Sequence, residues 1–152
     1  MHVIVIYDST YGNTELIAGS IGSAFNDEIK VVRVSELNPS EMMNADFLII
    51  GSPTHGGRPT PSIQKLMDGI PEQALNGICV AAFDTRFSSR MVRVFGYAAE
   101  RIANGLEAKG GKAVSPPEAF FVVGKKGPLR EGELERAASW AKMISTNLSL
   151  NS

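Results

Sequence analysis

Hydroxyl-bearing residues gather in a short turn near the start of the chain. Residues 7–15 read Tyr-Asp-Ser-Thr-Tyr-Gly-Asn-Thr-Glu, between an apolar run and a segment with helical spacing. A turn that ends at a helix N-terminus faces free backbone N–H groups and the positive end of the helix dipole. Ser9, Thr10 and Thr14 add hydroxyl groups, and Gly12 lets the backbone approach a ligand closely. The turn is therefore predicted to bind a phosphate group.

This turn contains no Lys or Arg, so dipoles and hydrogen bonds alone would have to balance the charge of the phosphate. We therefore expect a monophosphate rather than a triphosphate. The same residue types also suit an ordinary strand-to-helix turn with a capped helix and no ligand. The choice between these readings depends on the rest of the chain.

Two later stretches also carry candidate binding groups. Residues 51–61, Gly-Ser-Pro-Thr-His-Gly-Gly-Arg-Pro-Thr-Pro, form a long loop that pairs a rigid Pro-Thr segment with a flexible Gly-Gly hinge. Residues 85–90 are expected to form a third loop, in which Arg86 and Phe87 place a guanidinium and an aromatic ring side by side. The alternatives are a proline-rich surface connection for the second loop and simple packing for Phe87.

The elements that position these loops alternate between strand and helix patterns. Apolar or alternating runs predict strands at residues 3–6, 29–34, 47–50, 77–84 and 113–123, the last interrupted by Pro116 and Pro117. Helical spacing predicts helices over residues 16–25, 38–44, 63–70, 92–106 and 134–148, with Trp140 packing on the flank of the last.

This alternation predicts an α/β fold, a three-layer α-β-α sandwich around a five-stranded parallel sheet of order 2-1-3-4-5. In such sheets ligands sit beyond the carboxyl ends of strands 1, 3 and 4. Those ends are the three loops described above. The topology therefore favours one shared binding site over three unrelated turns.

Composition describes an ordinary globular protein, with 43% hydrophobic and 20% charged residues among 152. We expect one domain over residues 1–152. The net charge of −1 predicts no binding to nucleic acid or to anionic membranes, and lacks the acidic field typical of small carriers that dock onto basic partners. Cys79 lies in an apolar run and is expected to be a buried, inert thiol. Without a long apolar segment, we expect a cytoplasmic protein.

The loops resemble those of the flavodoxin family. Residues 7–15 resemble the family signature Ser/Thr-x-Thr-Gly-x-Thr, which follows strand 1 and wraps the phosphate of FMN. Residues 51–57 look like the family's loop after strand 3. Residues 127–129 and 132–137 look like its C-terminal segment. The resemblance covers nearly the whole chain, and its three motifs fall in the expected order.

The resemblance implies FMN as the cofactor and assigns its contacts by position. The phosphate would be held by Ser9, Thr10, Tyr11, Gly12, Asn13 and Thr14. The isoalloxazine ring would be edged by Pro53, Thr54, His55, Gly56 and Gly57, with Asp84, Thr85, Arg86 and Phe87 on its other side. A backbone carbonyl near the Gly-Gly pair would turn to accept a hydrogen bond from the reduced ring. No catalytic or metal-ligating residue is identified.

Tyr11 departs from the family signature, which has a second Thr at this position. A Tyr there looks like the flavodoxin-like quinone reductases and the flavodoxin domains of flavo-diiron proteins. Our leading interpretation is an electron carrier that serves redox protein partners as a monomer or weak homodimer. The alternative is an FMN-dependent NAD(P)H:quinone reductase, in which Arg58 and Arg86 would stabilise the reduced flavin or attract an anionic nucleotide. A flavodoxin-like scaffold that binds no flavin is a third possibility.

Other proteins of similar topology lack support in the sequence. A receiver domain needs a phospho-accepting Asp after strand 3, where this chain has Gly51-Ser52-Pro53. A low-molecular-weight phosphatase needs a Cys in the first loop, which has none. The Gly-x-Gly-x-x-Gly pattern of dinucleotide sites and the Lys-bearing loop of nucleoside triphosphatases are both missing after strand 1.

Overall fold

The computed structural model describes residues 1–87 and 97–150. Its strands are β1 (His2–Tyr7), β2 (Glu28–Arg33), β3 (Phe47–Pro53), β4 (Cys79–Phe87), β5 (Lys112–Ala113) and β6 (Glu118–Val122). Its α-helices are α1 (Asn13–Ser23), α2 (Pro61–Asp68), α4 (Ala98–Ala108) and α5 (Glu133–Leu150), and two short 3₁₀ helices are η1 (Val34–Glu36) and η2 (Pro39–Asn44). Strands and helices alternate, as the sequence predicts.

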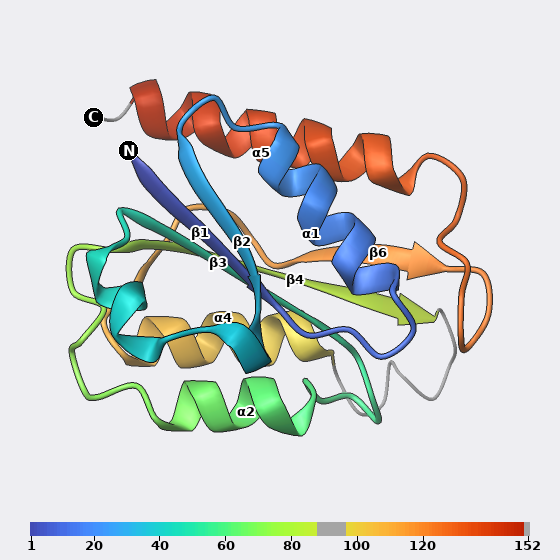
Figure 1. Ribbon diagram of the computed structural model, residues 1–152, viewed down its shortest axis with the longest axis horizontal. Coiled ribbons are helices and arrows are strands. Elements are labelled where there is room, and N and C mark those ends of the chain that lie inside the picture. The colour runs from blue at the N-terminus through green and yellow to red at the C-terminus, as the bar shows by residue number, and fades with distance from the viewer. Residues whose placement is uncertain (88–96, 151–152) are drawn as a thin grey trace.

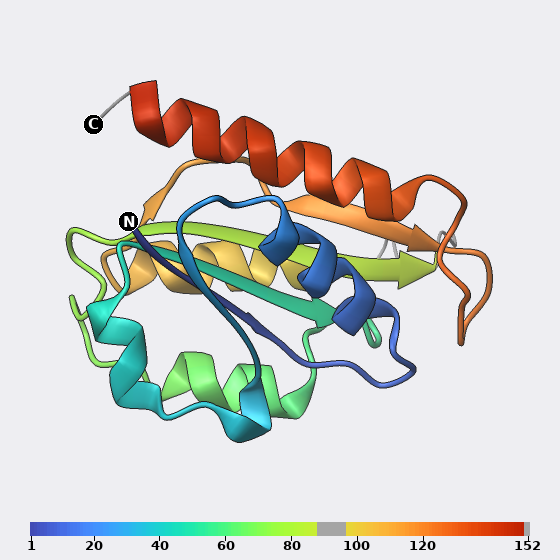
Figure 2. The ribbon, with the colours of Figure 1, turned by 45° about the horizontal axis from the view of Figure 1, so that its top comes forward.

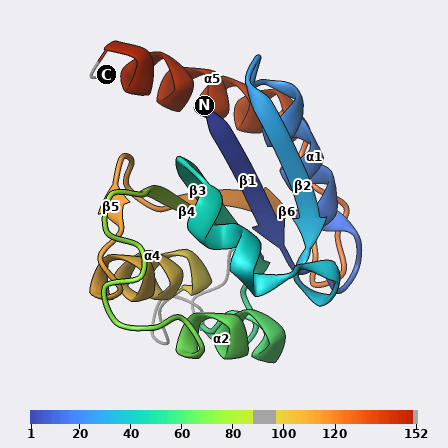
Figure 3. The same ribbon diagram turned by 60° about the vertical axis from the view of Figure 1, so that its left-hand side comes forward.

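The strands form one parallel sheet in the order β2-β1-β3-β4-β5, with β6 also paired to β4. Helices α1 and α5 cover one face and α2 and α4 cover the other, which gives three layers (Figure 1). Figure 3 shows β2 at one edge of the sheet and β5 at the opposite edge. The predicted three-layer α/β fold and its strand order are confirmed.

Alternation along the central strands creates two hydrophobic cores. In β1, Val3 and Val5 pack toward α1 and α5, whereas Ile4 and Ile6 pack toward α2 and α4. In β3, Phe47 and Ile49 likewise pack toward α1 and α5, whereas Leu48 and Ile50 pack toward α2 and α4. Because both faces are buried, every one of these side chains is fully covered, and the strand sequences are continuously apolar.

The last predicted strand is split at the predicted prolines. β5 pairs with the start of β4 and β6 pairs with its end, and residues 114–117 separate them. Figure 2 shows β6 (orange) running beside β4 toward the same edge. The sheet therefore has six strands rather than five, although β5 and β6 together occupy the one position expected for the fifth.

Three sequence predictions need correction. β4 continues to Phe87, so Thr85, Arg86 and Phe87 lie in the strand and not in a loop. Residues 39–44 form a 3₁₀ helix, with the side chain of Asn38 as its N-cap. Cys79 is partly exposed at the start of β4, not buried.

The helix predicted from residue 92 is described from Ala98 onward. Its predicted residues Val92 and Phe95, and Ser88, Ser89 and Arg90 of the third loop, lie outside the described residues. No helix in the described parts of the chain combines the length and apolar character that crossing a membrane requires.

The first turn of α5 is tied to β6 by a buried carboxylate. Glu133 accepts hydrogen bonds from Arg136 (2.9 and 2.8 Å) and from the backbone N–H of Phe121 (2.8 Å). Arg136 also donates to Glu118 and to the carbonyl of Ala119. The hydrogen bonds from Arg136 are the main reason that the pKa of Glu133 is lowered from its ordinary value.

The ring of Trp140 confirms the packing role predicted for it. It makes edge-to-face contacts with Phe83 and Phe120, with ring centroids 6.3 and 6.0 Å apart. Its indole N–H donates to the hydroxyl of Ser115 (3.1 Å), so its polar atom is satisfied. This cluster fixes α5 over the β4 and β6 strands.

Candidate functional site

Hydrogen bonds from the end of β2 and from the start of α2 hold the first loop in place. Arg33, from the end of β2, donates to the carbonyl of Ser9 (3.0 Å) and to the carboxylate of Glu15 (2.9 Å). Asp8 accepts from the N–H of Ser9 (2.9 Å) and from the hydroxyl of Thr60 (2.6 Å), which lies at the start of α2. The loop is therefore fixed before any ligand binds. Arg33 and Thr60 were not predicted as parts of this arrangement.

The hydrogen bonds within the loop leave donors available for an anion. The Ser9 hydroxyl oxygen accepts from the N–H groups of Gly12 (3.0 Å) and Glu15 (3.4 Å), so the hydroxyl proton is still available to donate. In the described part of the chain, no acceptor takes the backbone N–H groups of Tyr11, Asn13 or Thr14. These N–H groups lie at or near the N-terminus of α1, where the helix dipole favours a negative charge.

Gly12 has the backbone conformation that this loop requires. It is the N-cap of α1 with φ at 93°, a value that glycine adopts at little steric cost. A Cβ built there would meet no atom within 4 Å, so the space above Gly12 is open. Glycine is therefore favoured at this position by its positive φ, and not by a lack of space for a side chain.

The second loop contains a tight hairpin. His55 and Arg58 exchange backbone hydrogen bonds (2.9 and 3.1 Å), and Gly56 and Gly57 between them have φ values of 58° and 79°. Two positive φ values in succession are typical of a type I′ turn. The predicted Gly-Gly hinge is thus a defined turn.

The second loop is also anchored to α4. The hydroxyl of Thr54 accepts from the N–H of Ala98 (3.1 Å) at the start of the helix, and the carbonyl of Gly57 accepts from Arg101 (2.9 Å). The Gly57 carbonyl therefore has a partner. Gly56 lines the pocket, whereas Gly57 is buried.

The end of β4 combines a buried ion pair with an exposed ring. Arg86 donates to both carboxylate oxygens of Asp84 (2.8 and 2.6 Å), and its guanidinium carbon lies 3.3 Å from the centre of the Tyr97 ring. Asp84 also accepts a hydrogen bond from the backbone N–H of Ala99 (3.0 Å). Asp84 is completely buried and does not line the pocket. Phe87, 43% exposed, does line it.

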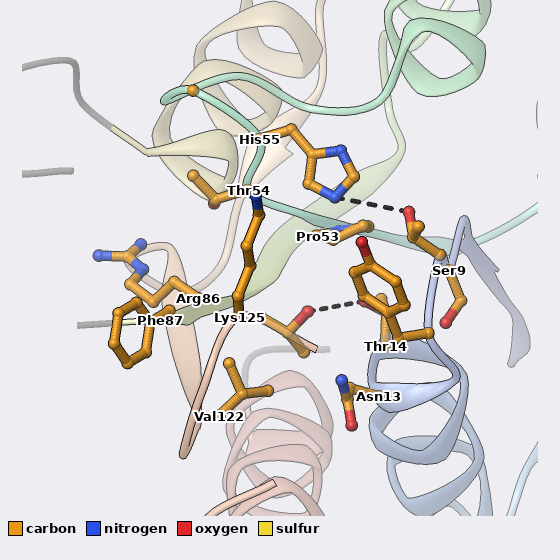
Figure 4. Close-up of a pocket in the computed structure, with 14 residues that line it drawn as sticks. Ser9, Asn13, Thr14, Pro53, Thr54, His55, Arg86, Phe87, Val122 and Lys125 are labelled. Atoms are coloured by element: carbon orange, nitrogen blue, oxygen red, sulfur yellow. Dashed lines mark hydrogen bonds between the residues drawn. The ribbon is translucent and has the colours of Figure 1, made fainter. Parts of the chain in front are cut away.

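A buried hydrogen bond joins the first loop to β4. The hydroxyl groups of Thr14 and Thr85 lie 2.7 Å apart, and either can be the donor. When Thr85 donates, Thr14 keeps its proton for a ligand. Figure 4 shows this contact and a second one at the rim, where His55 Nε2 lies 3.4 Å from the Thr10 hydroxyl.

These elements enclose a pocket of about 480 Å³, within the range typical of small-molecule sites. It is lined by Ser9, Thr10, Tyr11, Asn13, Thr14, Pro53, Thr54, His55, Gly56, Thr85, Arg86, Phe87, Val122 and Lys125. Twelve of these are among the residues that the sequence singled out. Of the predicted set, Gly12, Gly57 and Asp84 do not line the pocket.

Val122 and Lys125 complete the pocket and were missed by the sequence analysis. Val122 ends β6, and Lys125 projects into the space between the end of β4 and the first loop (Figure 4). Asn13 donates to the carbonyl of Lys126 (3.2 Å), and a Cβ on Gly127 would fall 2.7 Å from the Asn13 side chain. The turn after β6 therefore packs directly on the first loop. In the sequence, only the location of Val122 and Lys125 at the end of the final strand, which the predicted order places beside strand 4, could have indicated that they reach the pocket.

The fold and the pocket together define a class of protein. It is a doubly wound α/β domain with a pocket at the carboxyl edge of its sheet, where such folds bind their ligands. The family model for flavodoxin matches residues 5–140. The chain therefore belongs to the flavodoxin family, whose members bind FMN.

Individual relatives agree with this assignment. A flavodoxin from Aquifex aeolicus (strain VF5) is 33% identical over 72 residues, a match that spans 45% of this chain and 39% of that protein. Oxidised flavodoxin 1 from Bacillus cereus superposes with a TM-score of 0.81 at 19% identity, covering 96% of this chain and 98% of the other. A flavodoxin from the domain Archaea also gives 0.81, at 23% identity and with 98% and 99% coverage. At these identities the solved structures establish the fold.

The residues of the pocket fit FMN. Its polar side presents hydroxyl groups and unpaired N–H groups from residues 9–14, which suit a phosphate. Its other parts present Pro53, Phe87 and Val122, which suit the faces of an apolar ring. Lys125 adds a positively charged side chain to the lining of the pocket, a charge that the first loop lacks.

Proposed function

We propose that this chain is an FMN-binding electron carrier that passes electrons between redox protein partners. The observation that carries the proposal is that one pocket is lined both by the prearranged first loop and by the apolar residues Pro53, Phe87 and Val122. When bound, FMN supplies the redox chemistry itself. The chain supplies binding, orientation and exclusion of water.

In this proposal each group in the pocket has one task. Ser9, Thr10 and Thr14, with the N–H groups at the start of α1, hold the phosphate. Pro53, Thr54, His55 and Gly56 border the ring on the second loop, and Phe87 and Val122 border it on the other side. The carbonyl of Gly56 is the candidate acceptor for a hydrogen bond from the reduced ring, because that of Gly57 already binds Arg101.

The alternative, an FMN-dependent NAD(P)H:quinone reductase, loses part of its support. It relied on Arg58 and Arg86 to attract an anion, but the charge of Arg86 is balanced by the buried carboxylate of Asp84. Tyr11, the near-neutral net charge and the exposed Arg58 still favour a reductase. In a steady-state assay with NAD(P)H and a quinone, a carrier alone shows negligible turnover.

The binding step is tested by titrating the protein with FMN and with riboflavin, and following the quenching of flavin fluorescence. Riboflavin has the same ring and lacks the phosphate. We expect FMN to bind at least ~100-fold more tightly, because the anion-binding loop contributes several charge-assisted hydrogen bonds. Equal affinities would show that the loop does not hold the phosphate, and absence of binding would defeat the proposal altogether.

A further inference from the structure

We propose that the mouth of this pocket is a docking surface for an acidic redox protein, one that surrounds its own redox centre with carboxylates. The inference rests on the proposed electron-carrier function and adds the chemical class of the partner. It concerns Lys125, which lines the pocket, together with Arg58 and Lys126, which lie within two residues of lining residues; we call these three cations the basic rim.

The basic rim is exposed and unpaired. Arg58 lies in the hairpin of the second loop, and Lys125 and Lys126 lie in the turn after β6. Among the described residues, no carboxylate oxygen lies within 4.0 Å of any of the three. The ammonium of Lys126 sits 6.0 Å from the centre of the Tyr11 ring, at the edge of the pocket. Their charges are therefore available to a partner.

Three carboxylates on the strands and loops that form the pocket are already neutralised within the fold. Asp8 and Glu15 lie 3.5 and 2.9 Å from the guanidinium of Arg33, and Asp84 lies 2.6 Å from that of Arg86. No acidic residue lines the pocket. Among the described residues around the pocket, the surplus charge is consequently positive, although the chain as a whole carries −1.

The overall charge makes this asymmetry pronounced. The chain carries −1, so all residues other than the basic rim together carry −4, which is −1 minus the +3 of the rim. A positive region on a negative protein orients an approaching anionic surface toward the pocket and repels a cationic one. Charge complementarity therefore specifies an acidic partner.

One exposed aromatic ring favours a protein partner. Tyr11 is 48% exposed, and the ammonium of Lys126 lies 6.0 Å from the centre of its ring. Aromatic residues surrounded by charged groups are typical of transient protein interfaces, where apolar contacts supply affinity and charges supply orientation.

The test uses two probes that share one haem and differ in charge. Native cytochrome c is basic, and succinylated cytochrome c has its lysines capped with carboxylates. Stopped-flow mixing with the photoreduced, FMN-loaded protein measures the second-order rate of electron transfer. At low ionic strength we expect the succinylated probe to react about tenfold faster or more, with a rate that falls as salt is added. A faster reaction with native cytochrome c would overturn the inference.

Charge reversal locates the effect on the surface. The double variant Arg58→Glu, Lys126→Glu should invert the preference between the two probes. Lys125 stays unchanged because it lines the pocket. The matched control is Lys112→Glu, Lys142→Glu, which makes the same change in net charge at two exposed residues that do not line the pocket. Equal effects of both variants would show that net charge, not the basic rim, sets the preference, and would overturn the inference.

Two further readouts separate this inference from the proposed function. Titrating the isotope-labelled protein with succinylated cytochrome c, with and without FMN, should shift the amide resonances of Tyr11, Arg58 and Lys126 in both cases. Shifts confined to other surfaces would reject the docking site. If FMN binds and neither probe is preferred, the inference fails alone, whereas the proposed function fails if FMN does not bind. A loss of NADPH oxidation in the rim variant, without any change toward the protein probes, would assign the rim to a nucleotide instead.

Discussion

The β4 side of the pocket and its mouth use charged residues in opposite ways. On β4, Asp84 has no exposed surface and holds Arg86, a neighbour on the same face of the strand, through two hydrogen bonds. At the mouth, Arg58 and Lys126 are exposed and have no carboxylate partner among the described residues. Buried charges require partners, whereas exposed ones do not. The comparison separates charges that build the site from charges that are free to meet another molecule.

The largest effect is expected when the buried pair is broken. Asp84→Ala leaves the buried guanidinium of Arg86 without its carboxylate and removes the acceptor for the N–H of Ala99. We expect the free energy of unfolding to fall by about 3–5 kcal/mol, as for other buried pairs that lose one partner. Urea denaturation followed by circular dichroism measures this change.

Arg58→Ala provides the matched comparison from the mouth. Because its side chain is exposed and unpaired, we expect a change in the free energy of unfolding within about 0.5 kcal/mol. Similar losses in the two variants would remove the distinction between the β4 side and the mouth.

The second effect concerns Glu133, a buried carboxylate away from the pocket. Glu133→Gln weakens the contacts with Arg136 and Phe121 and should cost about 1–3 kcal/mol at about pH 7. The pKa of Glu133 is lowered in the folded protein, chiefly by hydrogen bonds from Arg136. Its contribution is therefore complete above the ordinary value of 4.5 and is lost as the pH falls through the lowered folded-state pKa.

The difference in stability between wild type and Glu133→Gln should accordingly shrink in urea titrations repeated from about pH 7 to about pH 3. Glu131→Gln, at an exposed position two residues before α5, should change stability by less than about 0.5 kcal/mol. A difference that stays constant over this range would mean that the charge of Glu133 contributes nothing to folding.

The smallest changes in stability are expected for alanine substitutions at two glycines, one before α1 and one within it. Gly12 has φ at 93°, so Gly12→Ala introduces backbone strain of about 1–2 kcal/mol although the space beside it is open. Gly19, in the middle of α1, also has open space, and Gly19→Ala should stabilise the protein by about 0.5–1 kcal/mol. Thermal unfolding of both variants measures these opposite signs, and a stabilising Gly12→Ala would contradict the loop geometry.

Much of the fold follows from local pattern. The continuous apolar runs of β1 and β3 predict strands buried on both faces, and the two prolines at 116 and 117 predict the break in the outer strand. The end of β4 could not be predicted in this way. Thr85, Arg86 and Phe87 read as the start of a loop, but β6 pairs with them, and Asp84 satisfies the charge of Arg86.

The candidate site was predicted where sequence neighbours define it and missed where distant segments meet. Residues 9–14 form a local motif, so the placement of all of them except Gly12 in the pocket lining follows from the sequence. Arg33 reaches the first loop only because β2 and β1 run parallel, and Lys125 reaches the pocket only because β6 ends beside β4. No periodicity in the sequence marks either residue.

The divided outer strand has a consequence for how the protein behaves at high concentration. An unbroken edge strand offers a row of free N–H and C=O groups onto which a second molecule can add its own strand. Here the edge is divided between β5 and β6, and the segment between them contains two prolines that have no N–H to donate. We expect this edge to resist aggregation by strand addition, and replacing Pro116 and Pro117 with residues that favour strands to make the protein less soluble.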